Sequence, residues 1–176
     1  MYVHIIMVKI AFWKSALCTD DSTQTIFDYA HLNQTVLGNE SVVLYNRRNL
    51  DNNQEIVQRF KDHFPPSKIK YVNHWLEVDE FLVRNNIDIL YVIKSGERDG
   101  QISYCKKTIV HCTEHIFQPH GDIYLPISDK VDGFLEHVHR NLIVPHPLWS
   151  HVATDSAMMQ IFKTNFLDPV IPFIPI

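Results

Sequence analysis

The segment Ile87-Asp88-Ile89-Leu90-Tyr91-Val92-Ile93 decides the fold class, because it is an almost unbroken apolar run. A strand with one exposed face alternates apolar and polar residues, whereas a run of this kind is typical of a parallel sheet that is covered on both faces. Apolar residues at helical spacing precede it, namely Trp75, Val78, Phe81 and Leu82. A helix followed by a doubly buried strand predicts an α/β fold.

The same alternation of strands and helices continues on both sides of this segment. Further strands are predicted at 8–13, 41–45, 69–72, 108–112, 123–127 and 142–144. Further helices are predicted to follow an N-cap at Asp21 or Ser22, to run from Ile56 to Pro65-Pro66, and to begin near Ser128. Alternation of this kind indicates right-handed crossovers in a mostly parallel sheet with helices on both faces. We therefore expect a single Rossmann-like domain.

Length and hydropathy suit one globular domain with a hydrophobic core. The chain has 176 residues, of which 45% are hydrophobic and 20% are charged. We expect the Rossmann-like domain to span residues 1–149, and residues 150–176 to form a C-terminal helix and a proline-containing tail packed on it. No run of about eighteen apolar residues lacks a charge, a proline or a polar break, so no membrane span is predicted.

Charge, cysteine and glycine content argue against several classes of protein. The net charge of −4 disfavours a nucleic-acid partner, because nucleic-acid-binding domains usually carry a basic excess. The three cysteines are odd in number and lack a C-x-x-C spacing, which favours a reducing, cytoplasmic location over a disulfide framework or zinc ribbon. Only five glycines occur, and no dinucleotide-binding or P-loop motif is present. A self-contained nucleotide site is therefore not expected.

The loops that follow strands carry the candidate site, because ligands of such sheets bind outside the carboxyl ends of the strands. After the first strand come Asp20 and Asp21, candidates for a catalytic base or an acceptor contact, and Thr23, a candidate substrate-binding residue. Capping of the following helix is the alternative explanation for an aspartate here. After the central strand come Lys94 and Glu97, which are either substrate-binding residues or part of a solvated turn.

His111 is the third candidate for a base or an acceptor contact. It opens the segment His111-Cys112-Thr113-Glu114-His115, which matches the H-x-x-E-H motif of a class of zinc proteases. In that motif one helical turn separates the histidines, but here His111 lies in the predicted strand 108–112, which places residues four apart about 13 Å from each other unless the chain turns immediately. That separation is too large for one zinc ion, so no metal is expected.

The remaining substrate-binding candidates are Glu114, His120, Asp122 and His146. The first three belong to the loop after the predicted strand 108–112, where they would line a ligand crevice. His146 lies between two prolines after the predicted strand 142–144. Ordinary hydrogen-bonded loop residues, and for His146 a stiff linker, are the alternatives.

Several ordered segments carry a family resemblance. They are Phe27-Asp28-Tyr29-Ala30-His31-Leu32-Asn33, Leu37-Gly38-Asn39-Glu40-Ser41-Val42-Val43, Asp88-Ile89-Leu90-Tyr91-Val92-Ile93-Lys94-Ser95-Gly96-Glu97, Val110-His111-Cys112 and Gln118-Pro119-His120-Gly121-Asp122. Together they resemble the N-terminal half of GT-B glycosyltransferases related to the glycosyltransferase 4 family, over about Lys9 to Pro147. The resemblance implies a Rossmann-like domain that faces a second such domain, which holds most of the sugar nucleotide.

The resemblance implies metal-independent transfer of a sugar from a nucleotide sugar to a hydroxyl of a saccharide or glycan acceptor. This chain would be the acceptor-side domain, and a separate donor-binding domain would be its partner. The chain departs from the family in two respects. Asp20-Asp21-Ser22-Thr23 stands where the family has an Arg-Gly-Thr-like loop, and an E-x7-E-like segment is absent. The alternative is a non-catalytic glycosyltransferase-like domain that binds a saccharide or a protein, or self-associates.

Overall fold

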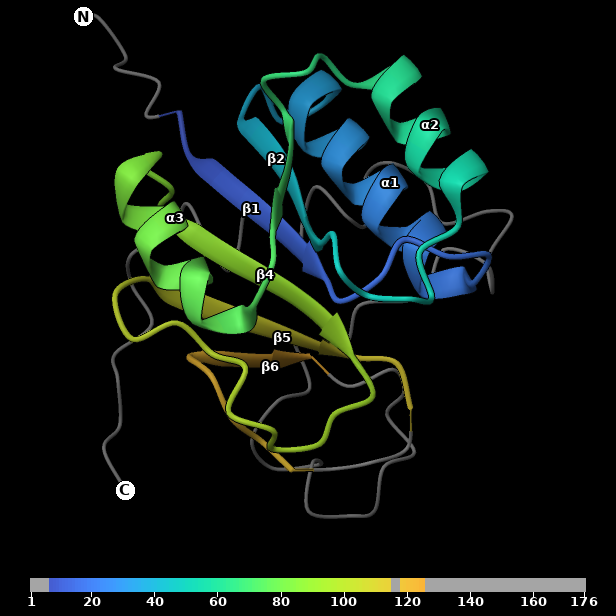
Figure 1. Ribbon diagram of the computed structural model, residues 1–176. Coiled ribbons are helices and arrows are strands. Elements are labelled where there is room, and N and C mark those ends of the chain that lie inside the picture. Colours follow the sequence, from blue (N-terminus) through green and yellow to red (C-terminus); the bar gives the residue numbers. More distant parts are fainter. Residues whose placement is uncertain (1–6, 115–117, 126–176) are drawn as a thin grey trace, which may run out of the picture.

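The computed structural model describes residues 7–114 and 118–125. Within these ranges the strands are β1 (Lys9–Lys14), β2 (Glu40–Asn46), β3 (Ile69–Val72), β4 (Ile89–Lys94), β5 (Lys107–Cys112) and β6 (Ile123–Leu125). They form one parallel sheet in the order β3-β2-β1-β4-β5-β6 (Figure 1). This order is that of the Rossmann fold, so the predicted α/β class is confirmed.

Helices cover both faces of the sheet, as the sequence predicted. On one face lie α1 (Asp21–Thr35) and α2 (Gln54–His63), whose Tyr29 and Phe60 are buried in a core shared with Phe12 of β1. On the other face lie the 3-10 turn η1 (Trp75–Glu77) and α3 (Val78–Arg84), and Leu82 of α3 is buried against the sheet. Figure 1 shows α1 and α2 side by side, with α3 across the sheet from them.

Strand β4 shows why its sequence is apolar at almost every position. Ile89, Tyr91 and Ile93 belong to the core under α1 and α2. Leu90 and Val92 belong to the core under α3. Because successive side chains of a strand point to opposite faces, a strand between two covered faces has no position for a solvated side chain.

The helix boundaries follow from capping and from backbone conformation. The N-cap of α1 is Asp20, one or two residues before the predicted Asp21 or Ser22, because its side chain accepts a hydrogen bond from the Thr23 backbone N–H. Asn53 caps α2 in the same way, accepting from the backbone of Glu55 and Ile56. After α3, Asn86 takes a left-handed φ of 52°, which stops the helix before β4.

The connection from β4 to β5, residues 95–106, contains no helix and lies against the α3 face. Trp13 of β1 donates its indole N–H to the Gln101 side chain at 3.3 Å. Asp79 in the first turn of α3 accepts hydrogen bonds from the Ser103 hydroxyl and the Tyr104 backbone. This loop thus takes the place of a helix that most βαβ units have here.

Several predictions of the sequence lie outside the described residues. They are the helix near Ser128, the strand 142–144, His146 and the tail 150–176. Among the helices that the structure describes, none combines the length and apolar character needed to cross a bilayer.

Because both faces of the sheet are covered, substitutions of a buried and an exposed leucine should change the free energy of unfolding by very different amounts. We expect Leu44→Ala in β2 to lower the free energy of unfolding by about 2–5 kcal/mol, because the fully buried side chain leaves a cavity. The control Leu50→Ala, at a side chain 98% exposed in the following loop, should change it by less than about 0.5 kcal/mol. Urea unfolding measures both values, and equal effects would contradict the assigned core.

Candidate functional site

The candidate site lies at the carboxyl edge of the sheet, where the chain order reverses between β1 and β4. Lys14 is the last residue of β1, and Lys94 is the last residue of β4. The Lys14 side chain is only 9% exposed. A charged group this deep requires a partner, and the loop after β1 supplies it.

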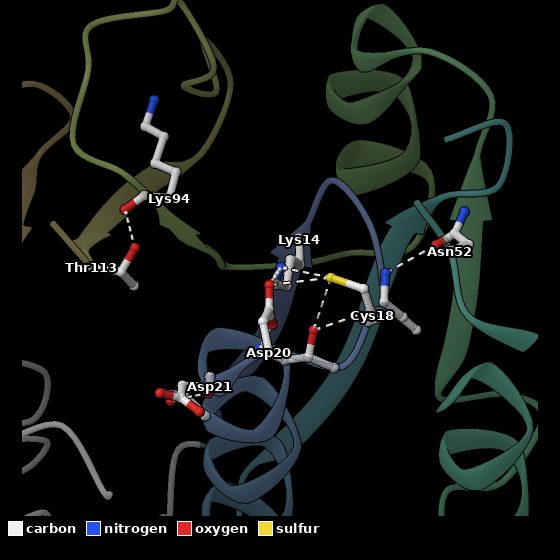
Figure 2. Close-up of polar contacts among 10 residues, drawn as sticks. Lys14, Cys18, Asp20, Asp21, Asn52, Lys94 and Thr113 are labelled. Carbon is white, nitrogen blue, oxygen red and sulfur yellow. Dashed lines mark hydrogen bonds and ion pairs between the residues drawn. The ribbon is translucent and has the colours of Figure 1, made fainter. Parts of the chain in front are cut away.

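What we call the Asp20 cluster consists of Lys14 at the end of β1, Cys18 and Asp20 in the following loop, and Thr23 in α1. Figure 2 labels Lys14, Cys18 and Asp20 of this cluster. Lys14 Nζ donates to Asp20 Oδ2 at 2.8 Å, and Cys18 Sγ donates to the same oxygen at 3.1 Å. The Thr23 backbone N–H donates to Asp20 Oδ1 at 2.7 Å. The Thr23 hydroxyl accepts from the Cys18 backbone N–H at 3.2 Å. Both carboxylate oxygens of Asp20 are therefore engaged.

The surroundings of Asp20 keep it ionised. Burial by itself raises the pKa of this carboxyl, but hydrogen bonds from Lys14, Thr23 and Cys18 outweigh burial and hold the pKa well below its usual range. A carboxylate with so low a pKa is a weak proton acceptor at neutral pH. The capping interpretation of Asp20 is confirmed, and the geometry favours a positioning role for it over that of a base.

The same carboxylate closes the N-terminus of α1. In nucleotide-binding Rossmann domains this helix end receives a phosphate on its free backbone N–H groups. Here Asp20 accepts the Thr23 N–H, and its negative charge lies at the positive end of the helix dipole. A phosphate at this position would meet a like charge. The absence of glycine from the loop after β1 and the Asp20 cap therefore both disfavour a phosphate site at the N-terminus of α1.

Asn52 links the loop after β1 to the loop after β2. Its Oδ1 accepts from the Leu17 backbone N–H at 2.9 Å, and its Nδ2 donates to the carbonyls of Asn46 and Asn49, each at 2.8 Å. The Asn53 N–H adds a bond to the Leu17 carbonyl at 2.9 Å. Sequence reasoning missed Asn52. The signal was the asparagine-rich run 49–53, since asparagine side chains often bond to nearby backbone groups in turns.

Lys94 does not join the Asp20 cluster. Trp13 pairs with Val92, so Lys14 lies beside Ile93 and Lys94 points to the opposite face of the sheet. Figure 2 shows the Lys94 side chain directed away from Asp20. Its ammonium pairs with Asp99 in the following loop.

The loops after β4 and β5 are also bonded to each other. The Lys94 carbonyl accepts from the Thr113 backbone N–H at 2.9 Å. Arg98 donates to the Pro119 carbonyl at 2.7 Å, and its backbone N–H donates to the Gln118 side chain at 2.9 Å. Beside this bonded pair of loops, Glu97 and Glu114 are exposed.

His111 lies inside the protein rather than on a loop. Its side chain is fully buried in β5, with Nδ1 2.9 Å from the Tyr91 hydroxyl and the ring stacked on Tyr29 at 6.0 Å. The strand predicted at 108–112 does end at Cys112, but the His111 side chain, which we expected at the exposed edge, faces α1 inside the core. The structure therefore does not bring His111 to the exposed edge with Asp21.

The other histidine and aspartate candidates are dispersed. Asp21 is exposed on the first turn of α1 and points away from the Asp20 cluster (Figure 2). His120 Nδ1 lies 2.6 Å from the Gln118 carbonyl, beside the Tyr124 ring. Asp122 accepts from the Thr108 backbone N–H at 2.6 Å, at the amino end of β5, because its loop has returned to the start of β6. Asp122 thus lies at the opposite edge of the sheet.

No three histidine, cysteine, aspartate or glutamate side chains of residues 7–114 and 118–125 are grouped as metal ligands. His115, the last residue of the H-x-x-E-H match, lies outside these residues.

No protein-family model matches the sequence, and no curated protein matches it significantly. Among solved structures, the crystal structure of S. aureus homoserine dehydrogenase at pH 7.0 is similar, with 12% identity and a TM-score of 0.34. The match covers 61% of this chain and 26% of the dehydrogenase chain. A likeness this weak says nothing about ligand or reaction.

The Asp20 cluster predicts a graded response to substitution. Asp20→Ala should lower the free energy of unfolding by at least about 1 kcal/mol, because it removes the N-cap and leaves the Lys14 ammonium without its carboxylate. Asp20→Asn should cost less, because asparagine is also a good cap. The control Asp21→Ala, exposed and outside the cluster, should cost least. Chemical denaturation at neutral pH gives the order.

The depressed pKa of Asp20 also sets the sign of a pH effect. Since the folded pKa lies below the unfolded one, the ionised carboxylate contributes stability above the unfolded value of about 4, and this stability is lost as pH falls through the folded value. The stability difference between the wild type and Asp20→Asn should therefore shrink in acid. A constant difference from neutral pH to pH of about 2 would be inconsistent with the ion pair.

The cluster also controls the reactivity of Cys18. Burial and the hydrogen bond to Asp20 raise the pKa of this thiol, against the opposing effect of Lys14. We expect Cys18 to react with iodoacetamide more slowly than the exposed Cys105 at neutral pH. Asp20→Asn should accelerate Cys18 and leave Cys105 unchanged. Peptide mass spectrometry of the modified cysteines separates the two rates, and acceleration of both would point to general loosening of the fold.

Proposed function

We propose that this chain is the acceptor-side domain of a GT-B glycosyltransferase, which transfers a sugar from a nucleotide sugar to an acceptor hydroxyl. A separate Rossmann-like domain would bind the donor. The ordered segments that resemble such enzymes support the proposal. The observation that carries it is the closed N-terminus of α1, where Asp20 occupies the position that a nucleotide-binding domain keeps free for phosphate.

The charge at this helix end determines which substrate the domain suits. A nucleotide sugar brings a diphosphate, and the ionised Asp20 would repel it. A saccharide acceptor is neutral at its hydroxyls and is bound through hydrogen bonds, which a polar edge can supply. The carboxyl edge of this sheet therefore suits the acceptor better than the donor.

Asp21 is the residue that we assign as the proton acceptor for the transfer. It lies one residue after the N-cap, is exposed, and points outward from the same helix end (Figure 2). A base must reach the acceptor hydroxyl, and an exposed carboxylate beside a rigid cluster is suitably placed. Asp20 would hold the helix start in position, Thr23 would act through its backbone and hydroxyl bonds, and Glu97 would be available to bind acceptor hydroxyls.

A non-catalytic binding domain is the second candidate function, and two exposed side chains favour it. Leu50 in the loop after β2 is 98% exposed, and Leu76 in η1 after β3 is 90% exposed. Both follow strands and so lie toward the carboxyl edge. Exposed leucines at one edge suit contact with another protein surface. In the glycosyltransferase proposal the same leucines would meet the donor-binding domain.

Calorimetry with the full chain tests whether it binds the acceptor and leaves the donor to a separate domain. We expect measurable binding of an oligosaccharide acceptor, and weaker binding of nucleotide sugars than of this acceptor. When the proposed donor-binding domain is added, nucleoside diphosphate should be released in the presence of both substrates. Asp21→Asn should reduce this release at least about a hundredfold, because general base catalysis contributes on that order.

Asp62→Asn is the matched control, since Asp62 is an exposed carboxylate on α2 that accepts a hydrogen bond from Gln58 of its own helix. It should leave nucleotide release unchanged. Tight nucleotide-sugar binding by the chain alone would contradict the assignment to the acceptor side. Acceptor binding without any nucleotide release in the presence of the donor domain would favour the non-catalytic candidate.

A further inference from the structure

Two adjacent arginines follow β2 at the carboxyl edge of the sheet. Arg47 lies with its guanidinium carbon 4.7 Å from the centre of the Tyr71 ring and donates to the Tyr71 hydroxyl at 2.9 Å. Arg48 lies with Nη1 3.2 Å from His74 Nε2. Tyr71 belongs to β3 and His74 follows it, so both guanidiniums lean toward the end of the same neighbouring strand. All four residues are exposed.

These two guanidiniums are not neutralised within the part of the chain that the structure describes. The ion pairs there engage Lys9, Lys14, Lys68, Arg84 and Lys94, and none includes Arg47 or Arg48. The Glu77 carboxylate, close in sequence to His74, accepts instead from the Asn73 backbone at 3.0 Å. A chain with a net charge of −4 thus presents two adjacent positive charges at the edge where its fold places ligands.

The loop that carries the arginines is held in one conformation. Asn46 Oδ1 accepts from the Arg48 backbone N–H at 2.9 Å. Asn52 bonds to the carbonyls of Asn46 and Asn49 and anchors the loop to Leu17. The Tyr71 ring in turn supports the Arg47 guanidinium from one side. A charged group whose loop is already ordered loses less conformational entropy when it binds a ligand.

We propose that Arg47 and Arg48 bind an oxyanion, the phosphate or carboxylate group of an acidic saccharide acceptor. Guanidinium groups match the geometry of both oxyanions through paired N–H donors. Arg47 uses Nη1 for the Tyr71 hydroxyl, and a guanidinium has further N–H donors beyond this one. That the ligand is a saccharide acceptor rests on the proposed function, whereas anion binding by Arg47 and Arg48 is independent of it.

Binding by the full chain, without any donor domain, tests this proposal. The probes are glucose 6-phosphate, glucuronate and neutral glucose, with titration followed by ¹⁵N NMR of the arginine side chains and of the backbone. We expect shifts at Arg47, Arg48 and Tyr71 with at least one charged probe and none with glucose. Binding should weaken as salt is added, because exposed charges are screened. A response to the phosphate, to the carboxylate or to both identifies which oxyanion the site takes.

The double variant R47A/R48A should lose at least about tenfold in affinity, because it removes both charge-assisted hydrogen-bond donors of the site. R47K keeps the charge but loses the planar stack on Tyr71, and it should bind with intermediate affinity. Arg59→Ala is the matched control. Arg59 also lies over an aromatic ring, with its guanidinium carbon 4.5 Å from the centre of Phe27, but it belongs to α2 and bonds to Gln24 of α1.

Unchanged affinity in R47A/R48A would overturn the proposal, as would equal binding of neutral glucose or an equal loss in Arg59→Ala. Backbone resonances of β4 and β5 report whether each variant keeps its fold, so a folding defect is recognised separately. Nucleotide release with a neutral acceptor, together with no anion binding, would reject the oxyanion site and leave the glycosyltransferase proposal standing. Anion binding without any sugar transfer would support the oxyanion site and reject the glycosyltransferase proposal.

Discussion

The carboxyl edge of this fold depends on the need to neutralise one nearly buried ammonium. Lys14 ends the central strand β1 with a side chain 9% exposed, and burying a charge of this kind is unfavourable without a partner. Asp20 supplies the opposite charge at 2.8 Å. To reach Lys14, the chain must bring Asp20 over the end of β1, and from this position the same carboxylate caps α1. The ion pair thus fixes the loop and the start of the first helix together.

Much of the fold could be predicted from the sequence, because burial on two faces leaves a periodic signal. The run 87–93 identified the strand β4, and Pro65-Pro66 correctly marked the end of α2. The N-cap of α1 was predicted one or two residues too late, since Asp20, Asp21 and Ser22 are all good caps and only the position of Lys14 distinguishes them. Local sequence does not contain that tertiary contact.

The candidate site was harder to predict than the fold. The sequence showed which residues end the strands. The direction of each side chain, however, depends on the register between strands, and this register places Lys14 and Lys94 on opposite faces of the sheet. His111 was expected to line the exposed edge near the end of the strand 108–112, but its side chain points into the core under α1. Asp122 was expected beside His120 at the carboxyl edge, but it directly precedes β6 and bonds to Thr108 at the amino end of β5. Sequence patterns identify polar loop residues, whereas strand length decides which edge they reach.

Asn52 has a further consequence for how this chain can vary. The loop from Ser15 to Asp20 contains no glycine, and Asn86 is the non-glycine residue with positive φ in the described ranges. The loop therefore takes its shape less from backbone freedom than from an amide that belongs to another loop. An insertion of one residue in either loop would move the amide away from Leu17. We expect the lengths of the two loops to be linked, so that related sequences lengthen or shorten both together.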